Sequence, residues 1–173
     1  MMAHDLAILF NALTKEEYIL KMIEKMKSSK TEFQYNEYEK QIIAKKKEEC
    51  HEAIEKALQE MEYFIDKFGN KFAAVFTQYQ FRNEIPEYIR NIGNPNSIKY
   101  VIIVALDKGE NGQKSYRLIE DGFDVNEIAK LHGGGGHVAA AAVAINARQK
   151  EKAMTLSKRN SLEYLVNCIY EED

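Results

Sequence analysis

The fold is decided by residues 131–145, which read LHGGGGHVAAAAVAI. Glycines lose more backbone entropy on ordering than any other residues, so Gly133–Gly136 form either a flexible loop or a segment of close backbone approach. An ordered turn of this kind exposes successive amides, which create a concave site for an anion. His137 follows directly and can donate a hydrogen bond to that anion, while Ala139–Ala142 admit a second backbone or a flat base. The stretch favours recognition of a phosphate or carboxylate group, with a plain flexible loop as the alternative.

The residues upstream predict a small mixed β-sheet. Tyr100–Leu106 is a nearly continuous apolar run, as expected for a central strand buried on both faces. The polar residues 107–112 predict a hairpin loop, and Gln113–Ile119 the returning strand. Further elements are expected as a strand at Phe72–Tyr79, a short helix from Asn83 to Ile92, and a short helix capped by Asp124.

The N-terminal residues predict helices. Residues 1–70 contain no proline, and their only glycine is Gly69. Thr14–Glu17 has the form of a capping box, and Thr31–Gln34 repeats it. From Tyr35 to Phe68 apolar residues recur at three- and four-residue steps, which predicts one amphipathic helix of about 35 residues that ends at Gly69. Such a helix links two bodies, supports an oligomer or wraps along the main domain.

Composition and charge exclude several classes of protein. The 173 residues fit one domain, or a small domain with an extension. Hydrophobic residues make up 45% and charged residues 29%, which excludes a disordered chain. The longest apolar runs fall far short of the ~20 residues that a membrane helix needs, so no membrane partner is expected. The net charge of −3 argues against strong non-specific DNA binding but allows a local phosphate pocket. Two cysteines make neither a disulfide framework nor a zinc site, so we expect a reducing, cytoplasmic setting.

The glycine-rich stretch and its surroundings resemble a known family. Residues 124–141 read DVNEIAKLHGGGGHVAAA, and Ser115-x-Arg117 precedes them on a predicted strand. This pattern is similar to the substrate-binding domain that accompanies DHH phosphoesterases, a family of RecJ-type exonucleases, nano-RNases and cyclic-dinucleotide phosphodiesterases. The resemblance covers roughly residues 70 to 146. A related domain of alanyl-tRNA synthetases has a similar glycine run but usually lacks the histidine, so His137 favours the phosphoesterase branch.

The resemblance implies a site for the phosphate of a short oligonucleotide, a dinucleotide or a cyclic dinucleotide. Arg117 would clamp a terminal or bridging phosphate, for which a guanidinium is well suited. The alternative for Arg117 is a salt bridge with Glu120 or Asp121. Asp124 is expected to cap a helix, and His132 to be no ligand. Where the family commonly continues Ala-Ala-Gly-Phe, this chain has Ala-Ala-Val at 141–143, and the added methyl group at 142 could narrow the site. The residues expected to bind substrate are Arg117, Gly133, Gly134, Gly135, Gly136 and His137.

The resemblance also implies that catalysis belongs elsewhere. In this family an N-terminal domain with an Asp-His-His segment and further Asp holds two divalent metal ions, Mn or Mg. This chain has six Asp, none of them in such a segment. We therefore expect no catalytic residue, metal or cofactor on this chain, and no hydrolysis by it alone, although the family's activity leaves its status as an enzyme open. The expected partner is a catalytic DHH domain, either on a separate chain or within a longer protein. A further alternative for the function is a hydrolase with an unrecognised metal site.

The sequence predicts an α/β (α+β) protein with long N-terminal connector helices, followed by a small mixed β-sheet domain flanked by helices. We expect three segments: residues 1–70 as the helical remnant and connector of a missing catalytic domain, 71–146 as the DHH-associated domain, and 147–173 as a C-terminal helical extension. The alternative function is a helix-mediated oligomerising interaction protein, for example a homodimer, that keeps the sheet domain only as a scaffold.

Overall fold

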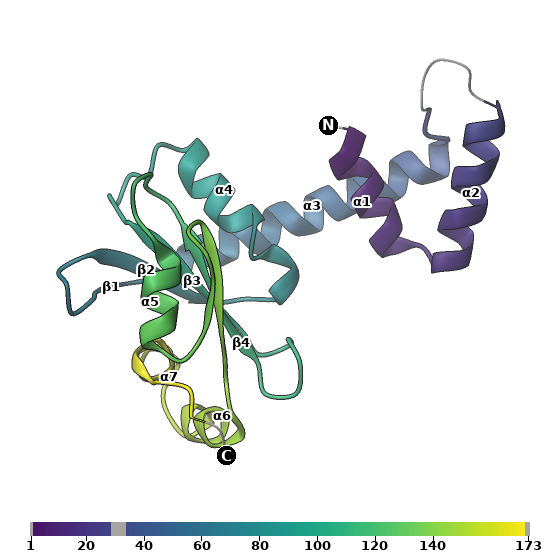
Figure 1. Cartoon of the computed structure of the whole chain (residues 1–173). Coiled ribbons are helices and arrows are strands. Elements are labelled where there is room, and N and C mark those ends of the chain that lie inside the picture. Colours follow the sequence, from purple (N-terminus) through teal and green to yellow (C-terminus); the bar gives the residue numbers. More distant parts are fainter. Residues whose placement is uncertain (1, 29–33, 172–173) are drawn as a thin grey trace. The chain divides into compact units, whose positions relative to one another are not determined.

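The structure is a computed structural model of the chain, and it describes residues 2–28 and 34–171. Within these residues it contains seven α-helices, one 3-10 helix and six strands in one mixed sheet (Figure 1). This arrangement confirms the predicted α+β class, with helices first and a small sheet flanked by helices after them. The chain divides into two compact units, residues 1–52 and 53–173.

The first unit is helical. It comprises α1 (Met2–Ala12), α2 (Lys15–Ser28) and the beginning of α3 (Glu37–Gln59). The buried side chains include Leu9 and Ile43, and Lys47 pairs with Asp5 at 2.6 Å. Burial alone would raise the pKa of Glu39, which is 1% exposed, but hydrogen bonds from Lys25 and a backbone amide hold that pKa below its ordinary value.

Capping boxes begin two of these helices. The predicted box at Thr14 is confirmed, because the Thr14 amide donates to Glu17 Oε2 at 3.0 Å and the Glu17 amide donates to Thr14 Oγ1 at 3.3 Å. The second predicted box, at Thr31–Gln34, falls largely on residues 29–33, outside the described residues. A capping box is found instead at the start of α3, where the Asn36 amide donates a hydrogen bond to Glu39 Oε2 and the Glu39 amide donates one to Asn36 Oδ1, each at 2.9 Å.

The predicted single helix over residues 35–68 is wrong beyond Gln59. The chain turns there, and Glu62–Ile65 forms strand β1, antiparallel to β2 (Lys71–Phe76). Asp66 closes the hairpin by accepting the amides of Phe68 and Asn70, each at 2.9 Å. Of the residues that continue the helical spacing here, Met61, Ile65 and Phe68, only Ile65 lies in the strand. The strand residues Tyr63, Phe64 and Ile65 are aromatic or β-branched, which suits a strand, and their pairing covers the edge of β2.

Beyond β1 and β2, the sheet contains β3 (Tyr100–Ala105), β4 (Gln113–Leu118), β5 (Gly135–His137) and β6 (Ala140–Ala144). Its strand order is β1-β2-β3-β4-β6-β5. Among the described strands only β2 and β3 pair in parallel, and the crossover between them holds the 3-10 helix η1 (Tyr79–Phe81) and helix α4 (Glu84–Asn91). All six residues of β3 are buried, which confirms the predicted central strand. The hairpin from β3 to β4 is also confirmed.

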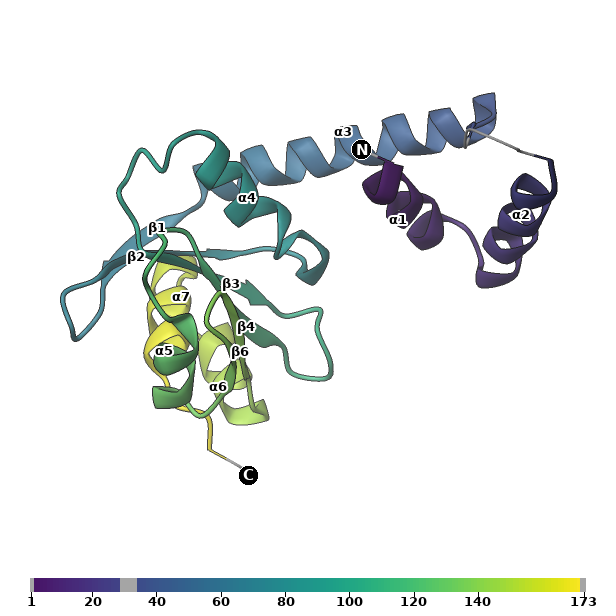
Figure 2. The same ribbon diagram turned by 45° about the horizontal axis from the view of Figure 1, so that its top comes forward.

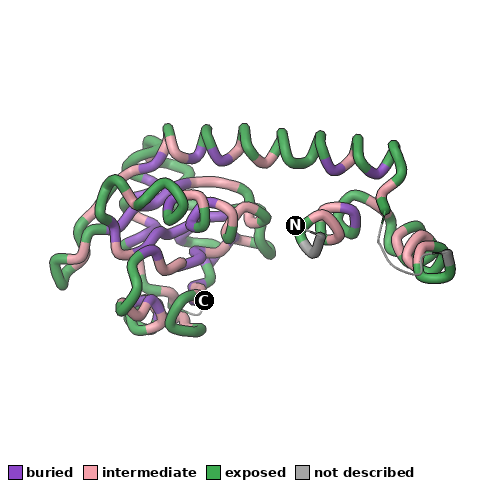
Figure 3. Tube along the Cα trace, turned by 90° about the horizontal axis from the view of Figure 1, so that it is seen from above, coloured by how far each residue is buried: buried purple, intermediate pink, exposed green. Residues whose placement is uncertain are grey.

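The two faces of the sheet are covered by different helices (Figure 2). One face carries the main hydrophobic core and is packed by α5 (Val125–Leu131), α6 (Ala147–Met154) and α7 (Lys158–Asn167). The other face is covered in part by α4, whose Ile85 and Ile89 are buried. Figure 3 colours each position by its burial, and the buried positions of residues 53–173 gather in the interior of that unit. The main core comprises Phe72, Ala74, Tyr100, Ile102, Val104, Tyr116, Val125, Ile128, Ala129, Ala141, Val143, Ile145, Ala153, Leu162, Leu165 and Val166.

The C-terminal residues are helical, as predicted. Helix α6 begins with a capping box between Asn146 and Gln149, and α7 places Leu162, Leu165 and Val166 in the core. The end of the chain therefore completes the core face of the sheet. None of the helices in residues 2–28 and 34–171 combines the length and the apolar character needed to cross a lipid bilayer.

Candidate phosphate-binding face

Arg117 and His137 lie in one row across the sheet. Arg117 on β4 is opposite Ala140 on β6, and Ala140 is opposite His137 on β5. Directly paired residues share a face of a sheet, so the Arg117 and His137 side chains project from the same face, with the Ala140 methyl group between them. Two strand spacings separate the two backbones by about 9–10 Å, which leaves room for a phosphate group.

The next row on this face is built from small residues. Ser115 on β4 is opposite Ala142 on β6, and Ala142 is opposite Gly135 on β5. Ser115 is buried and its Oγ accepts a hydrogen bond from Gln113 Nε2 at 3.1 Å. With only two methyl groups on β6 and no side chain at Gly135, the backbone of β6 and β5 is accessible from the Arg117 side. The methyl group of Ala142 lies on this face.

The first two glycines of the run end helix α5. Gly133 adopts φ +82°, its amide donates to the Lys130 carbonyl at 3.1 Å, and the Gly134 amide donates to the Ala129 carbonyl at 2.9 Å. These two bonds are the Schellman pattern, in which glycine takes the left-handed position after a helix. The Gly136 amide donates to Asn126 Oδ1 at 2.8 Å. The amides of three of the four glycines are thus engaged within the protein, so the expected nest of free amides is not formed.

Arg117 is half-buried and held by neutral oxygens. Its Nε donates to Asn83 Oδ1 at 3.2 Å. One of its terminal nitrogens donates to the carbonyls of Tyr116 at 3.0 Å and Ala141 at 3.3 Å. Asn83 stands at the N-cap position of α4, as predicted, but its side chain makes no capping bond. Its amide oxygen instead positions the guanidinium from a segment 34 residues away.

The alternative for Arg117, a salt bridge with Glu120 or Asp121, is wrong. Glu120 pairs with Lys99 at 2.5 Å, and no carboxylate in the described part of the chain forms an ion pair with Arg117. Partial burial, and after it the positive charge of Arg82, lowers the pKa of Arg117. An arginine nevertheless stays charged at neutral pH. The face therefore holds a partly desolvated cation without a counter-ion, which an anion would stabilise.

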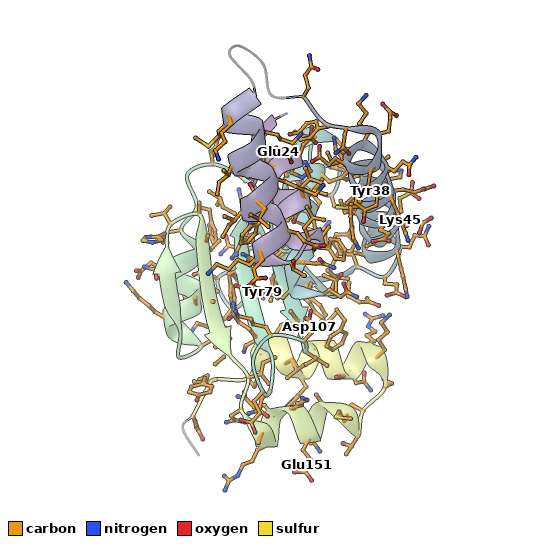
Figure 4. The ribbon with its side chains drawn as sticks, turned by 90° about the vertical axis from the view of Figure 1, so that its right-hand side faces the viewer. Glu24, Tyr38, Lys45, Tyr79, Asp107 and Glu151 are labelled. Carbon is orange, nitrogen blue, oxygen red and sulfur yellow. The ribbon has the colours of Figure 1, made fainter. Side chains whose placement is uncertain are left out.

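Two further cations contact the ring of Tyr79. The Arg82 guanidinium is 4.0 Å from the centroid of the Tyr79 ring, and the Lys108 ammonium is 4.5 Å from the same centroid. The Asp107 carboxylate accepts the Tyr79 amide at 2.9 Å and so ties η1 to the loop between β3 and β4; both residues are labelled in Figure 4. Cation–π contacts of this kind hold the two charges in place without neutralising them.

Sequence reasoning missed this group around Tyr79. Tyr79 ends a predicted strand and Arg82 lies between that strand and the helix predicted from Asn83, and no local pattern marks either residue as functional. Their proximity to Arg117 depends on the parallel crossover from β2 to β3, which brings the η1 segment onto the Arg117 face.

His137 and His132 lie in different environments. His137 is exposed on the edge strand β5. His132 is half-buried at the end of α5, and its Nδ1 lies 3.2 Å from the Cys168 carbonyl oxygen. Asp124 caps α5, as predicted, by accepting the Asn126 amide at 2.8 Å. Only His137 therefore belongs to the Arg117 face.

His132 makes stability depend on pH. Burial, and then the charge of Lys114, lowers the pKa of His132 below its ordinary value of 6.5. The unfolded chain then binds a proton more readily than the folded one, so this histidine's contribution to stability is present above pH 6.5 and is lost as the pH falls below it. We expect the free energy of unfolding to fall more steeply from pH 7 to 5 in the wild type than in His132→Gln, measured by urea denaturation. Parallel curves for the two proteins would contradict this.

No group of three or more His, Cys, Asp or Glu side chains in the described ranges is arranged to hold a metal ion. The residues of the Arg117 face do not include a carboxylate or thiolate donor set for a metal ion.

No family model matches the sequence, and no curated protein matches it. Among solved structures, the chain is similar to the DHH domain of a member of a family of ribosomal proteins, with 16% identity, a TM-score of 0.47 and coverage of 76% of this chain and 34% of the other. It is similar to a pGpG-specific phosphodiesterase from Vibrio cholerae, with 12% identity, a TM-score of 0.46 and coverage of 74% and 42%. It is also similar to an exopolyphosphatase-related protein from Bacteroides fragilis, with 17% identity, a TM-score of 0.41 and coverage of 91% and 41%. The chain spans less than half the length of each of these three, and the likeness is too distant to assign a function to it.

Proposed function

We propose that the Arg117 face binds the phosphate of a short oligonucleotide or a dinucleotide. The observation that carries the proposal is the row Arg117–Ala140–His137, which sets a guanidinium and an imidazole on one face with a methyl group between them. The guanidinium has no counter-ion among the described residues, and its neutral partners leave part of its donor set for a ligand. His137 is exposed and can donate from the opposite side of the same phosphate.

In this proposal each part of the face has a separate task. Arg117 supplies the charge and a fork of donors that suits two phosphate oxygens. His137 supplies one hydrogen bond, and Ala140, Ala142 and Gly135 leave the space between them open. The glycine run contributes close backbone packing and access, because the amides of Gly133, Gly134 and Gly136 are already engaged. Hydrolysis of the bound ligand is assigned to a two-metal catalytic domain outside this chain, in keeping with the sequence resemblance.

Titration calorimetry with the 5′-phosphorylated dinucleotide pApA tests this function. We expect wild-type protein to bind pApA at low salt, and Arg117→Gln to weaken binding about 10- to 100-fold, since a charge-assisted hydrogen bond is worth about 1.5–3 kcal/mol. His137→Ala is expected to weaken binding about five-fold, because it removes one neutral hydrogen bond. The affinity of the wild type is expected to fall as salt rises.

The matched control is Arg159→Gln. Arg159 is an exposed arginine on α7, on the other side of the sheet, and its Nε lies 3.8 Å from Glu62 Oε2. This variant removes the same charge and should bind pApA as the wild type does. Absence of binding to wild-type protein at millimolar pApA, or an equal loss in the Arg117 and Arg159 variants, would refute the proposed function.

A further inference from the structure

Helix α2 turns charged residues inward and apolar residues outward. Lys21 and Lys25 lie against the buried Glu39 of α3, with distances of 3.9 and 2.8 Å between nitrogen and oxygen. The same two ammonium groups lie 5.8 Å from the centroid of the Tyr38 ring and 5.6 Å from that of Tyr35. A helix on the surface of a globular protein ordinarily has the reverse arrangement, with its apolar side toward the core.

The outward side of α2 is apolar in its middle. Leu20 and Met26 are 66% and 77% exposed, and Ile19 and Ile23 are each 44% exposed. Their spacing places these four side chains on one side of the helix. Single exposed apolar residues are common on protein surfaces, but a contiguous group marks an interaction surface. Together with two exposed charged residues they form the outer face of α2, which comprises Glu16, Ile19, Leu20, Ile23, Met26 and Lys27.

We propose that the outer face of α2 binds the outer face of a second copy of the chain, with the two helices antiparallel. The proposal is independent of the phosphate-binding function, because α2 and Arg117 belong to different compact units of the chain.

The charges at the two ends of the outer face identify the occupant. Glu16 lies in the first turn of α2 and Lys27 in the last, and neither forms an ion pair with another described residue. An antiparallel pair of helices sets Glu16 of each copy beside Lys27 of the other. The same register sets Leu20 beside Ile23, because both pairs are symmetric about one point on the helix. The outer face is therefore complementary to itself, as a two-fold symmetric interface requires.

Other arrangements leave these charges unmatched. A parallel pair of helices would set Glu16 beside Glu16 and Lys27 beside Lys27. A partner surface of uniform charge would repel one end of the outer face, and like charges across an interface are unfavourable. A second copy in the antiparallel orientation pairs both ends.

The length of α2 limits the strength of the dimer. Its 14 residues span about 21 Å. One side of a helix of this length offers less than the area of about 800 Å² per partner that a standard interface buries. We therefore expect a weak dimer that exchanges with the monomer.

Sedimentation velocity of the full chain tests the proposal at concentrations from about 1 to 500 μM, a range that covers weak interfaces. We expect the mass to rise from that of one chain toward that of two. Leu20→Gln should weaken dimerisation at least about 30-fold, because both copies of the leucine leave the apolar centre. Leucine and glutamine have similar helix propensities, so α2 itself should persist. Met154→Gln is the matched control, since Met154 is 75% exposed on α6, and it should dimerise as the wild type does.

Charge reversal tests the antiparallel register. Glu16→Lys and Lys27→Glu should each weaken dimerisation about ten-fold at low salt, because each creates two like-charged pairs. The double variant Glu16→Lys/Lys27→Glu exchanges the charges and should recover the wild-type dimer. Effects of the two substitutions on the stability of α2 through its dipole would instead add in the double variant.

Three results would overturn the proposal. The first is the mass of a single chain at every concentration, which would assign the outer face to another partner. The second is an equal effect of Leu20→Gln and Met154→Gln on dimerisation. The third is a double variant that dimerises no better than the two single charge reversals.

Discussion

Replacing Gly134 by alanine is expected to destabilise the protein by about 3 kcal/mol or more, or to prevent folding. A Cβ atom at this position would lie 2.1 Å from the Ala142 carbonyl oxygen, 2.6 Å from Val143 Cγ2 and 2.9 Å from Val143 Cα. Two of these three atoms belong to the backbone of β6 and cannot move without breaking its pairing with β4 or β5. Overpacking against side chains typically costs about 1–3 kcal/mol, and a clash with backbone exceeds that range.

The adjacent glycine provides the control for this prediction. A Cβ atom at Gly135 would meet only Asn126 Oδ1, at an ordinary contact distance of 3.5 Å. Gly135→Ala should therefore change the free energy of unfolding by less than about 1 kcal/mol. Urea denaturation of the two variants, one position apart, measures both effects. Similar stabilities for Gly134→Ala and Gly135→Ala would show that the close approach of the glycine run to β6 does not govern the fold.

Lys114→Ala is expected to lower the free energy of unfolding by about 3 kcal/mol. Lys114 has no exposed surface, and its Nζ donates to the carbonyls of Leu165 at 2.9 Å and Cys168 at 2.8 Å. It thereby fastens the C-terminal end of α7 to the sheet. Truncation to alanine removes the packing of the methylene groups beyond Cβ from the core face and leaves two carbonyls without their strongest donor.

The desolvation of the Lys114 ammonium opposes the stabilisation by its hydrogen bonds. Burial lowers the pKa of Lys114, because the charged ammonium is poorly solvated there. Removing that charge relieves part of the desolvation cost. Lys114→Met keeps the apolar stem and relieves the same cost, so it should lose less than about 1.5 kcal/mol. Lys130→Ala is the surface control, since its ion pair with Glu127 is exposed and contributes little.

Urea denaturation followed by circular dichroism ranks these variants. The expected order of stability is wild type and Lys130→Ala together, then Lys114→Met, then Lys114→Ala. A loss of less than about 1 kcal/mol in Lys114→Ala would mean that the two carbonyls find other donors and that the core closes around the missing stem.

Local patterns predicted most of the elements correctly. The apolar run at Tyr100–Leu106, the polar loop after it and the caps at Thr14 and Asp124 are all signals contained in a few neighbouring residues, and the structure confirms each of them. The error at residues 60–68 arose because Met61, Ile65 and Phe68 continue the helical spacing although Glu62–Ile65 forms a strand. Only the pairing with β2 distinguishes the two, and that pairing is a tertiary contact.

For the candidate site, the sequence alone determined which side chains have the right chemistry: a guanidinium, an imidazole and a run of residues without side chains. Residue type is enough for that, because charge and hydrogen-bonding capacity belong to the individual side chain. Tertiary structure alone decided that Arg117 and His137 share a face, that Asn83 positions the guanidinium, and that the glycine amides are engaged rather than free. Strand register decides that Arg117 and His137 share a face, because a shift of one residue would send each side chain to the opposite face. Contacts between segments far apart in the sequence decide the position of Asn83 and the hydrogen bonds of the glycine amides.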